Sequence, residues 1–222
     1  MNSRLFTSEC VTPGHPDKVA DAISDAILDE CLRQDPSSRV ACETMVTTNF
    51  CMICGEITTK AVVDYPAVAR RVIRSIGYVH TGEGFDADTA QIQCRIHTQS
   101  PDIALGTCDE IGGAGDQGMM FGGACTQTKE YMPLPIALAR ALSSRLTQQV
   151  KINPLLRPDG KTQVTVEYDP RGNVLGIDTV VVSVMHSREF AIGDLREYVR
   201  EHAIAPVLER YGFSLNAVKH II

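Results

Sequence analysis

The chain has 222 residues, of which 44% are hydrophobic and 22% charged, and its formal net charge at pH 7 is −6. This length allows one large domain or two small ones with real cores, and the composition is typical of a globular protein. The acidic balance argues against a nucleic-acid partner but leaves open a nucleotide bound through a metal.

The sequence predicts no membrane span, because it contains no run of about 18 apolar residues. The N-terminus lacks the apolar stretch of a signal peptide, so a cytoplasmic location is expected. Eight cysteines in such a chain are typical of free, mostly buried thiols. Cys51 and Cys54 form a CxxC, but they lie in a predicted strand, where positions i and i+3 face opposite sides. A zinc site is therefore not expected there.

The first predicted helix covers residues 18–33 and begins at the run Gly-His-Pro-Asp-Lys at 14–18. Pro16 suits a first helical position, because its φ is fixed and its missing N–H would have had no partner. His15 and Asp17 then gather beside free helix N–H groups, where they could hold phosphate oxygens directly or through a divalent metal. On spacing alone, ordinary helix capping is the commoner explanation.

Two strands, 39–48 and 50–59, alternate in polarity and are predicted to form a hairpin. Glu43 and Glu56 lie inside them, where a carboxylate is disfavoured unless a cation, a metal or a substrate amine pairs with it. The alternative is that both face solvent on an open side of the sheet, and for either residue alone this alternative is favoured.

A helix is predicted from Asp64 to the stop at Gly77, and residues 90–98 alternate as a half-buried strand. No period follows from Ser100 to Gly118, where several glycines surround Asp116. A segment of this length is typical of an active-site lid or of a linker between domains, and the composition does not separate the two.

The remaining predicted elements are a strand at 119–126, a helix at 133–148, hairpin strands at 162–168 and 174–185, and a helix at 192–211 kinked by Pro206. Hairpins with packed helices predict an α+β fold in which helices cover one sheet face. The parts before and after the long segment have similar content, which suggests a structural repeat.

Eight runs occur along the whole chain in the order in which one family carries them. They are Leu-Phe-Thr-Ser-Glu (5–9), Gly-His-Pro-Asp-Lys (14–18), Val-Ala-Cys-Glu-Thr (40–44), Gly-Glu-Ile-Thr-Thr (55–59), Ile-Gly-Tyr (76–78), Gln-Ser-Pro-Asp-Ile (99–103), Gly-Ala-Gly-Asp-Gln-Gly-Met-Met-Phe-Gly (113–122) and Arg-Pro-Asp-Gly-Lys-Thr-Gln-Val-Thr (157–165). In them the chain closely resembles S-adenosylmethionine synthetase, also called methionine adenosyltransferase.

The resemblance implies sheet-plus-helices domains of that family, which has three such α+β domains related by pseudo-threefold symmetry. It implies an N-terminal domain at 1–100, a mobile active-site loop or linker at 101–118 and a central domain at 119–222, with the C-terminal domain absent. The family joins ATP to methionine: the methionine sulfur attacks C5′ of the ribose, and the expelled triphosphate is cut to pyrophosphate and phosphate.

The resemblance also implies roles for single residues. His15 would contact the triphosphate near the leaving oxygen as the catalytic residue, Asp17 would bind Mg²⁺, and Asp159 and Lys161 would contact ATP. Glu43 would lie at a K⁺ site, Glu56 and Gln99 would hold methionine, and Asp116 would lie near both methionine and the nucleoside.

The family forms homodimers or dimers of dimers with the active site between subunits, so ATP, methionine and a second subunit are the expected partners. The sequence stops at Ile222, before a third domain that in the family supplies further metal and phosphate contacts. Two hypotheses follow. One is S-adenosylmethionine synthesis, incomplete in this chain alone; the other is a non-catalytic relative that binds nucleotide or pairs with a full-length subunit.

Overall fold

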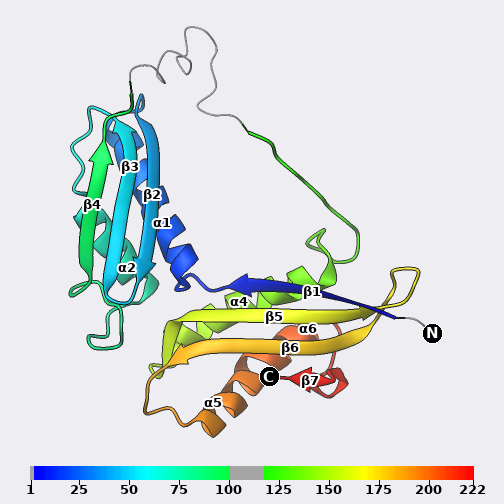
Figure 1. Ribbon diagram of the computed structural model, residues 1–222. Helices are drawn as coiled ribbons and strands as arrows, with labels where there is room; N and C mark the ends of the chain where they lie inside the picture. Colours follow the sequence, from blue (N-terminus) through cyan, green and yellow to red (C-terminus); the bar gives the residue numbers. More distant parts are fainter. Residues whose placement is uncertain (1–2, 101–117) are drawn as a thin grey trace. The chain divides into compact units, whose positions relative to one another are not determined.

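The structure is a computed structural model in which residues 3–100 and 118–222 are described (Figure 1). The chain divides into two compact units, one formed by Met1–Lys18 with Gly123–Ile222 and the other by Val19–Gly122. This grouping differs from a division at residue 100, because the first strand pairs within the unit that contains the C-terminal half. Among the described residues, no helix is both long and apolar enough to cross a membrane.

The unit Val19–Gly122 is built on a three-stranded sheet in the order β2-β3-β4. Strand β2 (Arg39–Thr47) pairs antiparallel with β3 (Phe50–Thr58), which pairs parallel with β4 (Gln91–His97). Helices α1 (Pro16–Gln34) and α2 (Tyr65–Ile76) lie over one face of the sheet (Figure 1). Their buried side chains are Val19, Ile23, Ile27, Cys31, Val68, Ala69, Val72 and Ile73. The predicted hairpin, helices and final strand are confirmed in this unit.

Helix α2 has local start and stop signals that the sequence displays directly. The Asp64 carboxylate accepts a hydrogen bond from the Ala67 N–H at 3.0 Å, which satisfies one of the free donors of the first turn. Gly77 ends the helix with φ of 112°, a conformation that side chains disfavour. Both predicted ends are confirmed.

The other unit contains a four-stranded sheet in the order β1-β5-β6-β7. Its strands are β1 (Arg4–Val11), β5 (Leu156–Tyr168), β6 (Val174–His186) and the short β7 (His220–Ile221). Helices α4 (Leu134–Ile152), α5 (Ile192–Val199) and α6 (Ala205–Arg210) pack on it, and a 3-10 turn, η3 (Leu215–Ala217), precedes β7. The core is closed by apolar side chains that include Leu138, Leu142, Val164, Val180, Ile204 and Leu208. Both units therefore have the predicted α+β composition.

The last helix is interrupted where Pro206 predicts a kink. A π-helical turn, η2 (Arg200–Ile204), separates α5 from α6. Proline has no N–H to donate to the carbonyl four residues earlier, which belongs to His202. That carbonyl instead accepts a hydrogen bond from Arg145 Nε of α4 at 2.8 Å. The break is thus compensated by a contact with the neighbouring helix.

Two predictions about strands were wrong or incomplete. Residues 119–126 form no strand, and Met119, Met120 and Phe121 are almost fully exposed. Three consecutive large apolar residues flanked by glycines give no period-2 pattern and little side-chain packing for a sheet. Strand β1 was not predicted, because its pairing partner β5 is about 150 residues away in the sequence and Leu5 and Phe6 are both exposed.

Candidate functional site

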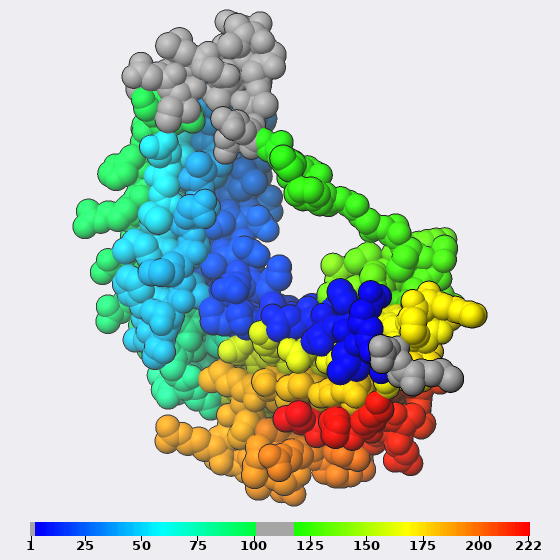
Figure 2. All heavy atoms as spheres, turned by 45° about the vertical axis from the view of Figure 1, so that its right-hand side comes forward, coloured from blue at the N-terminus to red at the C-terminus, as the bar shows by residue number. Residues whose placement is uncertain are grey.

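Two groups of predicted site residues lie in different units of the chain. The first occupies what we call the β1–α1 corner: Thr12–Lys18, between the end of β1 and the start of α1, together with Pro158–Lys161 of β5. The register of β1 against β5 places Val11 opposite Lys161, so the chain passes beside Asp159 and Lys161 as it leaves the strand. Figure 2 shows the dark blue N-terminal atoms packed against the yellow atoms of the sheet. Antiparallel pairing therefore brings together four of the predicted residues.

At the corner, His15 and Asp17 interact with each other at the start of α1. The Asp17 N–H donates to His15 Nδ1 at 3.3 Å, and the Asp17 carboxylate lies 3.7 Å from the same nitrogen. A neutral His15 with Nδ1 accepting carries its proton on Nε2, which leaves that N–H available to a ligand oxygen. The Asp17 side chain is 88% exposed, so its oxygens can take an external cation.

Asp159 and Lys161 have contrasting environments on the same strand. Asp159 is half-buried, and burial raises the pKa of its carboxyl, whereas a positive charge on the nearby His15, when that ring is protonated, opposes the rise. Lys161 is exposed and its Nζ lies 2.9 Å from Glu9 Oε2 of β1. An ion pair of two half-exposed side chains contributes at most about 1 kcal/mol, so a phosphate could displace Glu9 from Lys161.

The backbone at this corner is tightly packed. Gly14 is buried, and a Cβ at that position would lie 2.3 Å from the backbone carbon of Pro158. Only glycine permits this approach, and the contact holds the turn that carries His15 against the strand that carries Asp159.

The second group occupies what we call the open sheet face, the side of β2-β3-β4 that α1 and α2 leave uncovered. Strand register makes one cross-strand row of Glu43, Cys54 and Arg95, and a second row of Ala41, Glu56 and His97. Glu43, Glu56, Arg95 and His97 are all exposed. The chain neighbours of Glu43, Cys42 and Thr44, point to the helix side, and Glu56 lies on the same face as Glu43, so the solvent-facing alternative is confirmed for both carboxylates.

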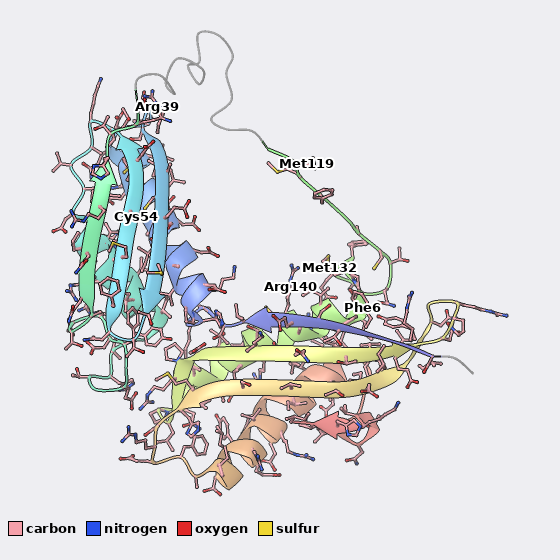
Figure 3. The ribbon with its side chains drawn as sticks, viewed as in Figure 1. Phe6, Arg39, Cys54, Met119, Met132 and Arg140 are labelled. Carbon is pink, nitrogen blue, oxygen red and sulfur yellow. The ribbon has the colours of Figure 1, made fainter. Side chains whose placement is uncertain are left out.

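Gln99 extends this face beyond the end of β4. Its side-chain oxygen accepts from Arg39 Nε of β2 at 3.1 Å, and its N–H donates to Thr58 Oγ1 of β3 at 3.3 Å. Arg39 and Thr58 are register partners, so Arg39, Thr58 and Gln99 make a third row beside the row of Glu56. Figure 3 labels Arg39 at one end of β2 and Cys54 partway along β3. Glu56 and Gln99 therefore lie on the same face in neighbouring rows.

The cysteines of β3 behave as the sequence predicted. Cys51 is fully buried, and burial raises the pKa of its thiol to about 11, whereas Cys54 lies on the opposite, open face. Within residues 3–100 and 118–222, no cluster of three or more His, Cys, Asp or Glu side chains could hold a metal ion. Asp116 lies outside the described residues.

Sequence reasoning missed several residues that the structure places beside the predicted ones. Glu9 contacts Lys161, and Arg39 holds the side chain of Gln99. Thr12 joins the two strands of the corner. Only the strand register could have revealed these contacts, because each joins positions far apart in the sequence.

Comparisons with known proteins cover both parts of the chain. Residues 3–101 match the family model of the S-adenosylmethionine synthetase N-terminal domain, and residues 111–222 match that of the central domain. The S-adenosylmethionine synthase of Pseudothermotoga lettingae is 51% identical over 230 residues, which cover 96% of this chain and 58% of that protein. The S-adenosylmethionine synthase of Fusobacterium nucleatum subsp. nucleatum is 49% identical over 219 residues, covering 98% of this chain and 56% of that protein. The chain thus spans a little over half the length of these relatives.

Proposed function

The chain belongs to the S-adenosylmethionine synthetase family, and from that premise we propose that it supplies ATP- and methionine-binding parts of an enzyme that makes S-adenosylmethionine. In this reaction the methionine sulfur forms a bond to C5′ of ATP, and the bond from C5′ to the triphosphate oxygen breaks. The triphosphate leaves with the electron pair and is then hydrolysed to pyrophosphate and phosphate. The observation that carries the proposal is the convergence of His15, Asp17, Asp159 and Lys161 at the β1–α1 corner.

At this corner the proposed ligand is the triphosphate of ATP. Its departure concentrates negative charge, so cationic and N–H groups aimed at its oxygens lower the barrier. His15 would donate from Nε2 near the leaving oxygen, and Lys161 would exchange Glu9 for a phosphate oxygen. Asp159 would accept hydrogen bonds from the nucleotide.

Asp17 is the proposed Mg²⁺ ligand of this corner. A single exposed carboxylate fits that ion, because protein-bound Mg²⁺ usually keeps one or two carboxylates and completes its shell with water and phosphate oxygens. The bound ion would neutralise part of the phosphate charge.

On the open sheet face we propose Glu56 and Gln99 as the methionine contacts and Glu43 as the K⁺ ligand. Within the described residues neither Glu43 nor Glu56 has a side-chain hydrogen bond or an ion pair, so both carboxylates are available to an added cation or ammonium group. An exposed sheet face is also a surface that a second subunit can cover. This supports a homodimer, or a dimer of dimers, with the site between subunits. Asp116 remains a proposed methionine and nucleoside contact.

The test measures binding of Mg²⁺ with ATP, and of Mg²⁺ with tripolyphosphate, by isothermal titration calorimetry. Asp17→Asn should weaken Mg²⁺-dependent binding about tenfold or more, because each charge-assisted contact is worth roughly 1.5–3 kcal/mol. Asp25→Asn is the matched control, since Asp25 is also an exposed aspartate of α1. Equal affinities for the two variants would contradict the assignment of Asp17.

A second measurement tests the reaction itself. An enzyme that contains this chain and the further domain of its family is incubated with ATP, methionine, Mg²⁺ and K⁺, and S-adenosylmethionine, pyrophosphate and phosphate are quantified. Equal amounts of the three products are expected, and their formation should fall with Asp17→Asn and not with Asp25→Asn. ATP hydrolysis without S-adenosylmethionine would count against the proposal.

A further inference from the structure

Thr12 is buried at the centre of the β1–α1 corner, with 1% of its surface exposed. Its backbone N–H donates to the Gly160 carbonyl at 2.9 Å, and its carbonyl accepts from the His15 N–H at 3.0 Å. Its hydroxyl donates to the Pro158 carbonyl at 2.6 Å and lies 3.2 Å from the Gly160 carbonyl. One residue therefore bonds to the turn of His15 and to both chain neighbours of Asp159.

The strands around Thr12 are fixed to helix α4 by two further buried hydroxyls. Ser143 Oγ donates to the Val11 carbonyl at 2.8 Å, and Thr162 Oγ1 donates to the Ala139 carbonyl at 2.8 Å. Both side chains are buried, Ser143 at 4% exposure and Thr162 at 0%. Residues on either side of the corner are thus held to the same helix, and the Thr12 hydroxyl is a buried side-chain link from the end of β1 to the carbonyls on either side of Asp159.

We infer that Thr12 is a positioning residue for the triphosphate site, an inference that rests on the proposed function. Its hydroxyl sets the backbone on which Asp159 and Lys161 stand, and its carbonyl sets the turn that carries His15. Thr12 would touch neither ATP nor metal, and it acts through these residues. A site built from two strands binds a triphosphate well only if its groups are held close to the binding geometry beforehand.

The test compares three variants with the wild-type chain for Mg²⁺-tripolyphosphate binding by calorimetry. Thr12→Val keeps the shape but removes the hydroxyl, and it should weaken binding about tenfold. Thr12→Ser keeps the hydroxyl and should bind within about twofold of wild type. Thr7→Val is the matched control, because it removes a hydroxyl of β1 whose partner is Thr165 at 2.8 Å. It should leave affinity unchanged.

Amide hydrogen exchange gives a readout that needs no ligand. The Thr12 N–H donates to the Gly160 carbonyl across the corner, and the His15 N–H donates to the Thr12 carbonyl within the turn. Thr12→Val should speed the exchange of both N–H groups about tenfold, while Thr12→Ser and Thr7→Val should not. Should Thr12→Val fail to fold, Thr12→Ala replaces it, since its smaller side chain admits a water to the Pro158 carbonyl.

Several outcomes would overturn the inference. A folded Thr12→Val or Thr12→Ala chain with wild-type affinity would do so, as would equal losses in Thr12→Val and Thr7→Val or a Thr12→Ser variant as weak as Thr12→Val. If the wild-type chain itself bound no tripolyphosphate, the proposed function would fail, and the positioning role with it. The exchange rates would then show only whether the Thr12 link holds the fold.

Discussion

The β1–α1 corner and the open sheet face hold their candidate binding residues in opposite ways. At the corner, a buried glycine, a buried threonine and backbone hydrogen bonds fix the groups before any ligand binds. On the open face, Glu43 and Glu56 are fixed only by strand register, and their side chains point into solvent. Contacts within one unit therefore hold the residues of the corner in place. The carboxylates of the open face, in contrast, would hold a cation firmly only if another surface covered them.

Water screens the carboxylates of the open face, and this screening limits how firmly they could bind a cation. Two opposite unit charges 4 Å apart attract by about 1 kcal/mol in bulk water but by about 4 kcal/mol at the effective dielectric constant near a protein surface. An ammonium group or K⁺ on an uncovered carboxylate would thus be held weakly. The proposed second subunit would provide such a cover, and three sets of substitutions test the comparison.

Gly14→Ala should produce the largest effect, because it breaks the packing of the corner. The new Cβ would lie 2.3–2.5 Å from Pro158 atoms, two of which are backbone. We expect a loss of unfolding free energy of about 3 kcal/mol, at the upper end of overpacking costs, together with loss of triphosphate binding. Urea unfolding of the purified variant measures the first and calorimetry the second.

Gly193→Ala is the matched control. A Cβ at Gly193, in helix α5 of the same unit, would meet no atom within 4 Å. This variant should be at least as stable as wild type, because alanine is the better helix former by about 0.5–1 kcal/mol. If Gly14→Ala matched Gly193→Ala in stability and binding, the close packing of Gly14 against Pro158 would not be what holds the corner in place.

The sequence predicted the open-face unit well because its signals are local. The cap at Asp64, the stop at Gly77 and the alternation of 39–48 and 50–59 each lie within a few residues of the element that they define. The charged residues could be identified, but which side of the sheet they face depends on where the helices pack. For Glu43 only the structure decides it.

The corner could be predicted only in part. His15 and Asp17 stand out in one run, and the family resemblance adds Asp159 and Lys161. Their proximity depends on the pairing of β1 with β5, which is not local, and β1 itself carries no clear strand pattern. Thr12 was missed for the same reason, because its hydroxyl acts on a carbonyl that follows it by 146 positions.

The Asp159→Asn variant tests whether the Asp159 carboxyl at the corner is buried. The pKa of Asp159 is raised by burial, so the folded state binds its proton more tightly than the unfolded state. Wild-type stability therefore falls as the pH rises from the ordinary value of 3.8 through the raised pKa. The variant, which carries no such charge, should be more stable than wild type near pH 7, and the difference should vanish at acidic pH. Urea unfolding between about pH 4 and about pH 7 measures both.

Asp169→Asn is the control of opposite sign at the other end of β5. The Asp169 carboxylate accepts from the Asn173 side chain and from the N–H groups of Asn173 and Arg171, each at 2.8 Å, and its pKa is lowered. Its contribution to stability is present above the ordinary pKa of 3.8 and is lost as the pH falls through the lowered pKa. This variant should be less stable than wild type near pH 7. Parallel pH slopes for the two variants would contradict the burial of Asp159.

Glu43→Gln and Glu56→Gln should have the smallest effect on the fold, because within residues 3–100 and 118–222 neither carboxylate makes a side-chain hydrogen bond or an ion pair. We expect changes in unfolding free energy within about 0.5 kcal/mol, as for surface substitutions elsewhere.

Glu30→Gln on α1 is the contrasting variant. Its hydrogen bonds with Arg33 and Gln34 lower the pKa of Glu30 to about 2, and losing the charge should lower the melting temperature measurably. A loss above about 1 kcal/mol in Glu43→Gln would mean that the carboxylate already has a stabilising partner. If Glu43→Gln or Glu56→Gln keeps its stability but loses methionine-dependent turnover, the substituted carboxylate acts in the proposed site between subunits and not in the fold.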